Sequence, residues 1–120
     1  MKIAITSAGK DLDSKVDPRF GRAAYFIIID PETMAFEVVE NSQNLNLPQG
    51  AGIQAGRTIV DHKVDVLLTG NCGPKAFQVL QSTGVKVITG VAGQVKDALR
   101  QFKDNEMQEA QQANVDGHWV

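Results

Sequence analysis

The chain has 120 residues, of which 42% are hydrophobic and 22% charged, and its net charge is −2. These values predict one compact domain and exclude a nonspecific nucleic-acid binder, which needs a basic stripe to displace counterions. The single cysteine excludes a disulfide within the chain. No apolar run reaches the ~20 residues of a membrane span, and the opening MKIAIT lacks the features of a signal peptide. We therefore expect a cytoplasmic protein whose thiol stays reduced.

The first half of the chain predicts strands separated by polar loops. A short β-branched run is followed by a long polar loop with Gly9, Pro18 and Gly21, and then by two apolar runs. Pro31 lies between these two runs and indicates an antiparallel hairpin. A loop rich in Asn and Gly, residues 41–52, comes next. The expected strands are residues 2–6, 24–30 and 35–40.

The second half alternates helical and extended patterns. After the Asn-rich loop the hydrophobic period changes from two to about 3.6, which indicates a helix. The expected helices are residues 53–62, 74–83 and 94–103, and the expected strands are residues 64–69 and 85–89. We take residues 1–104 as one α/β domain and residues 105–120 as a loosely held polar tail.

The resulting order, β-β-β-α-β-α-β-α, predicts an α/β fold with a mixed five-stranded sheet flanked by three helices. Right-handed crossovers make the last strands parallel, while the hairpin supplies the antiparallel part. With the first strand running up the centre, the second runs down and the other three run up. All three helices then begin at one edge of the sheet, beside the loop that follows the first strand.

Glycines precede every helix at this edge, which predicts a ligand site. Glycine lets backbone amides approach a ligand, and helix N-termini carry unpaired amides and a partial positive charge. Three converging helix starts, with basic side chains of the first loop, favour an anion. The alternative is that each glycine merely closes a turn. The candidate binding residues are Lys10, Arg19, Gly21, Arg22, Gly52, Gly70, Asn71, Gly73 and Gly93.

Cys72 is the candidate metal ligand of this edge. Gly73 is the expected N-cap and Pro74 the first helical residue, so the thiol lies just outside a helix start, with Lys75 one turn inside. Such surroundings lower the pKa of a cysteine and favour the metal-binding thiolate. The alternative is a small half-buried turn residue, because one cysteine lacks the spacing partner of a zinc or cluster motif.

The histidines and carboxylates add no readable catalytic set. His62 is expected at the far end of its helix, on the opposite edge, where it would interact with the helix dipole. His118 lies in the tail and reaches the edge only if Trp119 anchors it. The first strand also lacks the carboxylates of a two-metal nuclease. A binder is therefore favoured over an enzyme.

The segments MKIAITSAGKDLDSKVDPRFGRAAYFIIID, GAGIQAG, GNCGPKAFQVL and GVKVITG resemble the dinitrogenase iron-molybdenum cofactor biosynthesis family. The resemblance covers about residues 1–104, and FGRA with its preceding loop is its most specific part. It implies a ribonuclease H-like fold without the catalytic carboxylates of that fold. It also implies carriage or insertion of an anionic iron-sulfur or iron-molybdenum cluster, which brings most of its own sulfide ligands.

Two functions follow as hypotheses. The first is a non-catalytic carrier that binds a cluster transiently, with Cys72 as ligand and the basic edge as cradle, and exchanges it with a cluster-donating or cluster-accepting protein. The second is a regulatory module that binds a small anion or phosphorylated metabolite at the same edge without the thiol. An enzyme with Cys72 as nucleophile is less favoured, because no histidine is placed as its base.

Overall fold

The structure, a computed structural model, describes residues 1–41, 50–105 and 107–114. The predicted order of elements is confirmed, and the predicted bounds differ from the observed ones by one or two residues. The strands are β1 (Ile3–Ser7), β2 (Tyr25–Ile29), β3 (Phe36–Glu40), β4 (Val66–Leu68) and β5 (Lys86–Ile88). The helices are α1 (Ala51–Asp61), α2 (Pro74–Ser82) and α3 (Val95–Lys103). Most of the expected Asn-rich loop lies outside the described residues, as do His118 and Trp119.

The five strands form one mixed sheet in the order β3-β2-β1-β4-β5. β1 is central: it pairs antiparallel with β2 and parallel with β4, while β3 is antiparallel to β2 and β5 parallel to β4. The predicted strand directions are therefore confirmed. Each of the three helices begins at the edge where β1, β4 and β5 end, which we call the carboxyl edge.

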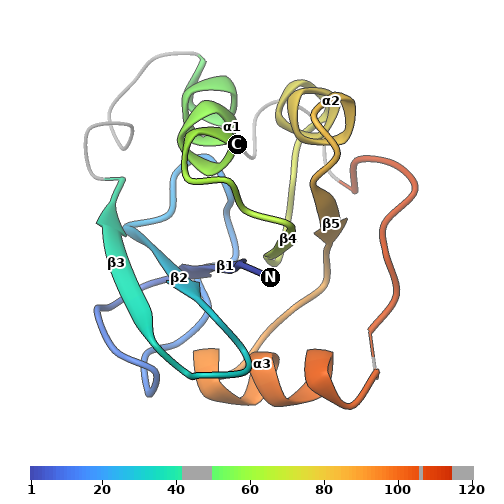
Figure 1. Cartoon of the computed structure of the whole chain (residues 1–120). Helices are drawn as coiled ribbons and strands as arrows, with labels where there is room; N and C mark the ends of the chain where they lie inside the picture. The colour runs from blue at the N-terminus through green and yellow to red at the C-terminus, as the bar shows by residue number, and fades with distance from the viewer. Residues whose placement is uncertain (42–49, 106, 115–120) are drawn as a thin grey trace.

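Helices cover both faces of the sheet, with α1 and α2 on one face and α3 on the other (Figure 1). Because β1 is buried on both sides, all five of its residues are buried, and its sequence is apolar without alternation until Thr6. The α1 and α2 face encloses Phe20, Phe26 and Cys72, whereas the α3 face encloses the Ile3 and Ile5 side chains. The sheet is thus held rigidly from both sides, and its carboxyl edge is a fixed platform.

The last described residues pack against this platform, contrary to the expectation of a loosely held tail. The amide of Ala110 donates to the carbonyl oxygen of Val87 at 2.7 Å, so the chain runs beside β5. Ala110 and Ala113 pack on the α1 and α2 core, and Met107 packs on the α3 core. Three apolar side chains and one backbone hydrogen bond hold this segment in place. These contacts were not predicted because the sequence of the tail is mostly polar.

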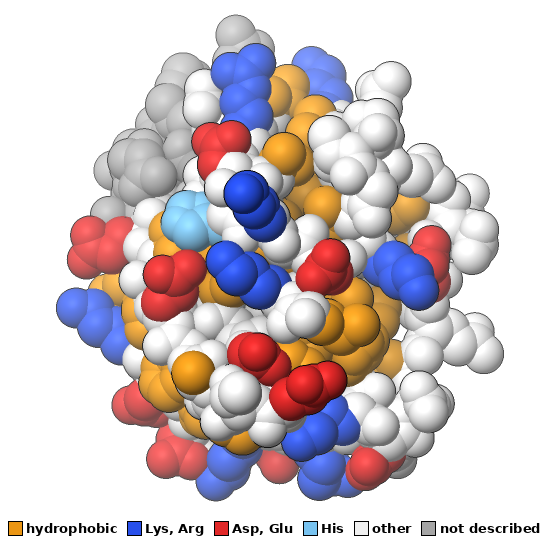
Figure 2. Space-filling model, in the orientation of Figure 1, with side chains coloured by type: hydrophobic (Ala, Val, Ile, Leu, Met, Phe, Trp, Pro, Cys, Tyr) orange, Lys and Arg blue, Asp and Glu red, His pale blue; other side chains and the backbone are white. Residues whose placement is uncertain are grey.

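The opposite edge, where the N-terminus lies in Figure 1, carries side chains of both charges. Lys or Arg and Asp or Glu side chains are interspersed over the face drawn in Figure 2. Among the described residues, no helix is both long and apolar enough to cross a membrane.

Candidate functional site

The loop after β1 lies across the carboxyl edge and is fixed there by buried hydroxyls. The Thr6 hydroxyl donates to the carbonyl oxygen of Asp17 at 2.7 Å, and the Asp17 amide donates to the Thr6 carbonyl oxygen at 2.9 Å. The hydroxyl of Thr69, at the end of β4, lies 3.0 Å from that of Thr6. Both threonines are fully buried, so their hydroxyls need these partners. The loop is therefore bound to two neighbouring strands at once.

The Asp17 carboxylate shapes the segment that follows it. Its two oxygens accept from the amides of Arg19, at 3.1 Å, and Ala24, at 3.3 Å. The Phe20 side chain between them is fully buried and lies among residues of α1 and α2, with its ring centroid 5.6 Å from that of Phe26. Segment 19–23 is thus fixed against the core formed by these two helices by one carboxylate and one aromatic anchor.

Arg19 and Arg22 flank the buried Phe20 on this segment. Arg19 is exposed and Arg22 partly buried. A β-bridge joins Arg19 to Asn71, and the Phe20 amide donates to the Asn71 carbonyl oxygen at 3.1 Å. These contacts bring Arg19 to the turn that opens α2. The predicted meeting of the first loop with the β4–α2 turn is therefore present in the structure.

Lys10 and Lys75 add charge to the same edge. The Lys10 ammonium lies 5.6 Å from the ring centroid of Tyr25, at the start of β2, within cation–π range. Lys75 is an exposed residue of the first turn of α2, where amides have no carbonyl partner four residues earlier. The basic groups of the edge thus come from two elements, the loop between β1 and β2 and the first turn of α2.

Glycine is required at position 70 for a reason that differs from the predicted one. A Cβ atom at this position would lie 2.8 Å from the Cα and carbonyl oxygen of Pro18. Asn71 is likewise engaged by the first loop, since its side-chain amide donates to the Pro18 carbonyl oxygen at 3.0 Å. The close approach that requires glycine here is made by the chain's own loop, and Asn71 contacts the same loop.

The start of α3 is closed by the same loop, which corrects the expectation of three open helix starts. The amides of Val95 and Lys96 donate to the carbonyl oxygens of Ser14 and Leu12, both at 2.9 Å. Gly93 adopts φ +87°, and its carbonyl oxygen accepts from the Val16 amide at 2.8 Å. The amides of Val95 and Lys96 therefore already have acceptors and are not available to an anion. Gly93 likewise takes part in a contact with the first loop.

The starts of α1 and α2 differ from that of α3. Gly50 precedes α1 with φ +83°, a left-handed conformation that glycine adopts without strain, and Gly52 is buried in the first turn. Gly73 is the extended N-cap of α2 and Pro74 its first residue, as predicted. Gly21 is buried in segment 19–23, and its carbonyl oxygen accepts from the Asn41 side chain at 3.1 Å.

Cys72 is not placed as a metal ligand, contrary to the expectation of a reactive thiolate. Its side chain is fully buried in the α1 and α2 core, with Sγ 3.7 Å from the Gly73 carbonyl oxygen. Burial raises the pKa of the thiol from 9.0 to about 12. Desolvation of the charged form outweighs the nearby helix start, because the sulfur points into the core rather than toward solvent. Cys72 lies in the turn between β4 and α2, as the alternative expected, but it is fully buried rather than half-buried.

Asn114 is a residue of the edge that the sequence pattern did not indicate. Its side-chain oxygen accepts from the Cys72 amide at 2.8 Å, and its side-chain nitrogen donates to the Gly70 carbonyl oxygen at 3.2 Å. Its own amide donates to the Cys72 carbonyl oxygen at 3.3 Å. Asn114 therefore completes the hydrogen bonding of the β4–α2 turn. No local signal marks it, because its partners lie more than forty residues away and it stands in a run without hydrophobic period.

Metal-ligating side chains do not gather in the described part of the chain, where no group of three or more His, Cys, Asp or Glu could hold an ion. His62 ends α1 at the opposite edge, as predicted, and its Nδ1 lies 2.8 Å from the Thr58 carbonyl oxygen. The site is thus a basic surface built on segment 19–23 and two helix starts, with no cage of protein ligands among the described residues.

The structure is thus a small α/β domain with basic side chains at its carboxyl edge, and its sequence matches a known family. The family model for the dinitrogenase iron-molybdenum cofactor matches residues 1–105, and the chain belongs to this family. Its fold matches the apo form of the orange protein from Desulfovibrio gigas with a TM-score of 0.92 and 45% identity, covering 95% of this chain and 96% of that one. A candidate NifB protein from Thermotoga, of the DUF35 family, gives 0.78 and 40% over 90% and 91%.

A relative without a described function aligns with this chain over a similar length. An uncharacterised protein of Methanocaldococcus jannaschii is 23% identical over 112 residues, which are 90% of this chain and 94% of that protein. The family domain therefore spans nearly the whole of such small relatives.

Replacing Gly70 by Ala should destabilise the protein by about 1–3 kcal/mol, because the new methyl group must displace the Pro18 backbone. Urea unfolding measures the loss, and amide NMR shifts should extend to Arg19 and Phe20. Gly84→Ala is the matched control: its site is open but has φ +85°, so about 1 kcal/mol should be lost without shifts in the first loop. Unchanged Arg19 and Phe20 signals in Gly70→Ala would contradict the contact.

The Cys72 thiol should react slowly with iodoacetamide in the folded protein. At pH 8 a thiol of pKa about 12 has a thiolate fraction roughly a thousandfold below that of the same thiol in urea, where its pKa is 9.0. Mass spectrometry of timed aliquots, native and in urea, measures the ratio. Labelling of the native protein at the unfolded rate would show that the thiol is accessible and ionised.

The same pKa shift should make the contribution of Cys72 to stability depend on pH. Because the folded state holds this proton to higher pH, the unfolded state ionises first, and stability falls from pH 9 toward pH 12. The slope is at most ~1.4 kcal/mol per pH unit for one group. Cys72→Ala lacks the group, so urea melts should show its stability deficit relative to the parent shrinking above pH 9. A constant deficit would contradict the raised pKa.

Proposed function

We propose that this protein is a non-catalytic carrier that binds an anionic iron-sulfur or iron-molybdenum cluster as its cargo and exchanges it with a partner protein. The observation that carries the proposal is segment 19–23. It presents Arg19 and Arg22 on either side of a fully buried Phe20, beside the turn that opens α2. A buried aromatic anchor and the Asp17 carboxylate hold the backbone of the two arginines in place.

The donor set supports one kind of cluster and argues against another. The described residues bring no three metal-ligating side chains together, and Cys72 is buried with a raised pKa. A cluster that needs several protein thiolates therefore has no support here. A cluster that brings its own sulfide ligands and a negative charge needs hydrogen-bond donors and positive charge instead. Arg19, Arg22, Lys10 and Lys75 are such groups.

Each part of the edge has a distinct task in this proposal. The guanidinium groups of Arg19 and Arg22 are planar forks of donors and remain charged at any physiological pH. The first turns of α1 and α2 add partial positive charge along the same direction. His62, the one histidine among the described residues, lies at the opposite edge, so the proposal assigns it no part in binding the cargo.

Family membership and the two solved relatives support a cofactor-binding or accessory role. The family is named for the iron-molybdenum cofactor, and the orange protein, at 45% identity, was solved in an apo form, the term for a protein without its bound group. The Thermotoga relative is described as a candidate NifB protein. The choice of an anionic cluster rather than another cofactor is our own step, and it rests on the basic edge.

The test is anaerobic titration with isolated iron-molybdenum cofactor and, separately, with a thiolate-capped 4Fe–4S cluster. We expect stoichiometric uptake by the parent and by Cys72→Ala, because the thiol lies in the core. Arg19→Ala and Arg22→Ala should each weaken binding about tenfold or more, since each removes charge-assisted hydrogen bonds. Absorbance and metal analysis after gel filtration measure the bound cluster.

Lys86→Ala is the matched control, since it removes one exposed positive charge at the first residue of β5, on the opposite edge. It should bind like the parent. Uptake that is equal in the parent and both arginine variants would overturn the proposal, as would loss of uptake in a folded Cys72→Ala protein. If inorganic phosphate binds in an arginine-dependent way and neither cluster does, the protein is a small-anion module that uses the same edge.

A further inference from the structure

The two edge strands of the sheet, β3 and β5, differ in what lies beside them. β5 is accompanied by the last described residues, with the Ala110 amide bonded to Val87 at 2.7 Å. β3, at the other end of the strand order, pairs with β2 alone among the described residues. Exposed edge strands invite pairing with another chain, and proteins usually blunt them with Lys or Pro. The sequence of β3, FEVVE, has neither.

The hydrogen-bond pattern fixes which backbone groups of β3 point outward. Asp30 donates to Ala35, and Asn41 donates to Ala24, so these positions form bonded pairs with β2. In an antiparallel ladder bonded and non-bonded pairs alternate, and therefore residues 37 and 39 also face β2. The amides and carbonyls of Phe36, Val38 and Glu40 consequently point away from the sheet. No partner for this row of alternating donors and acceptors lies among residues 1–41, 50–105 and 107–114, so it could pair with a further strand.

Side chains along this strand give the row a chemical preference. Glu37 and Glu40 are exposed, and the turn before them contributes Asp30 and Glu32. The two ion pairs of the described residues, Lys96 with Asp13 and Arg100 with Asp104, involve none of these acids. The β2–β3 hairpin therefore carries acidic residues both in its turn and along β3.

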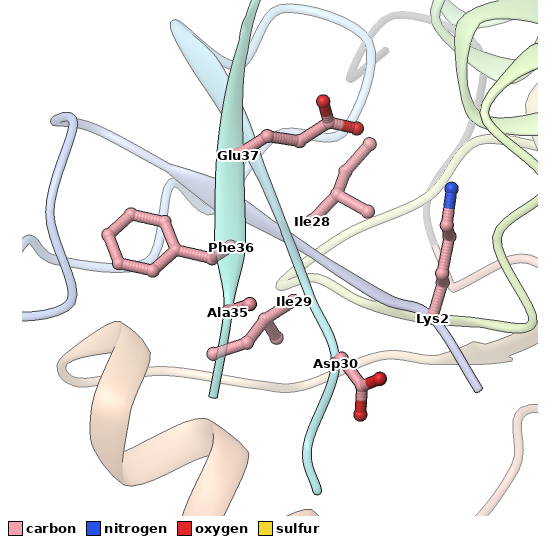
Figure 3. A pocket seen from close by; sticks show the side chains of 7 residues that line it. All are labelled: Lys2, Ile28, Ile29, Asp30, Ala35, Phe36 and Glu37. Atoms are coloured by element: carbon pink, nitrogen blue, oxygen red, sulfur yellow. The ribbon is translucent and has the colours of Figure 1, made fainter. Parts of the chain in front are cut away.

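Apolar surface accompanies the acids. Of the exposed large hydrophobic residues, Met34 (42%) and Phe36 (43%) both lie on this hairpin. A hollow of about 330 Å³ lies beside the first residues of β3 and is lined by Lys2, Ile28, Ile29, Asp30, Ala35, Phe36 and Glu37 (Figure 3). In Figure 3 the Phe36 ring and the Glu37 carboxylate point to opposite sides of the strand. Strand addition combines these features, since the backbone gives affinity and pockets for alternate side chains give specificity.

We propose that β3 is a docking edge for an extended segment of a partner protein in which Lys or Arg alternate with β-branched apolar residues. The cations of such a segment face Glu37, and its apolar side chains continue the Phe36 and Val38 side of the strand. A second copy of this chain fits less well, because pairing two β3 strands brings two acidic hairpins together. This docking edge is distinct from the arginines of segment 19–23.

The test uses a capped synthetic peptide, KVTVKVTVK, and its charge-reversed counterpart, EVTVEVTVE. In NMR titrations we expect the lysine peptide to shift the amides of Phe36, Val38 and Glu40 and to slow their hydrogen exchange. Glu37→Lys should weaken this binding about fivefold or more, because a cross-strand attraction becomes a repulsion. Glu32→Lys makes the same change of charge in the turn outside the strand and should bind like the parent.

Three outcomes would overturn the proposal. No shift at Phe36, Val38 and Glu40 would mean that the peptide does not pair with β3. The glutamates of β3 would then serve only to prevent pairing with other edge strands. Equal binding of the two peptides, or of the Glu37→Lys and Glu32→Lys proteins, would remove the basic preference. Sedimentation showing dimers, with the same three amides protected in the absence of peptide, would assign the edge to a second copy. None of these outcomes depends on whether the arginine edge binds a cluster.

Discussion

The crossing of the first loop over the carboxyl edge is the constraint on which the rest of the site depends. One hydroxyl, that of Thr6, binds the Asp17 carbonyl oxygen and meets Thr69, so the loop is joined to β1 and β4 inside the core. A buried polar contact has few alternatives, because unpaired hydroxyls away from water are costly. The position of Asp17 then sets the backbone from Arg19 to Ala24, and with it both arginines.

The same crossing makes the three helix starts at the carboxyl edge differ, although the order of strands and helices alone would make them alike. Three helices begin there, but the loop carbonyls of Leu12 and Ser14 take the first amides of α3, while segment 19–23 packs against the core formed by α1 and α2. At the start of α3 the Lys96 ammonium is also paired with Asp13 at 2.7 Å, so the proposed anion site lies on the α1 and α2 side. An anion held here would lie over the α1 and α2 face, and the α3 face would serve to support the loop.

The sequence revealed the fold well because its signals are local, and it revealed the site less well because the decisive contacts are not. Hydrophobic period and glycine or proline punctuation predicted every helix and strand within two residues. The direction of the Cys72 sulfur depends instead on how α1 and α2 pack, and Asn114 reaches Cys72 across 42 residues. Gly70 was marked correctly as a close approach, but the sequence could not tell a ligand from Pro18.

A carrier must bind cargo and partner within one small domain, and the geometry of β3 bears on how the two would meet. Its last residue, Glu40, pairs with Tyr25, over whose ring the Lys10 ammonium lies at 5.6 Å. A strand docked along β3 would therefore have one end at the basic carboxyl edge and the other beside the hairpin turn. Backbone pairing would orient such a partner with little cost in side-chain order, because the edge it joins is already fixed by the sheet. Transfer of an anion would then need only the last residues of the partner strand to approach Arg22 and Lys10.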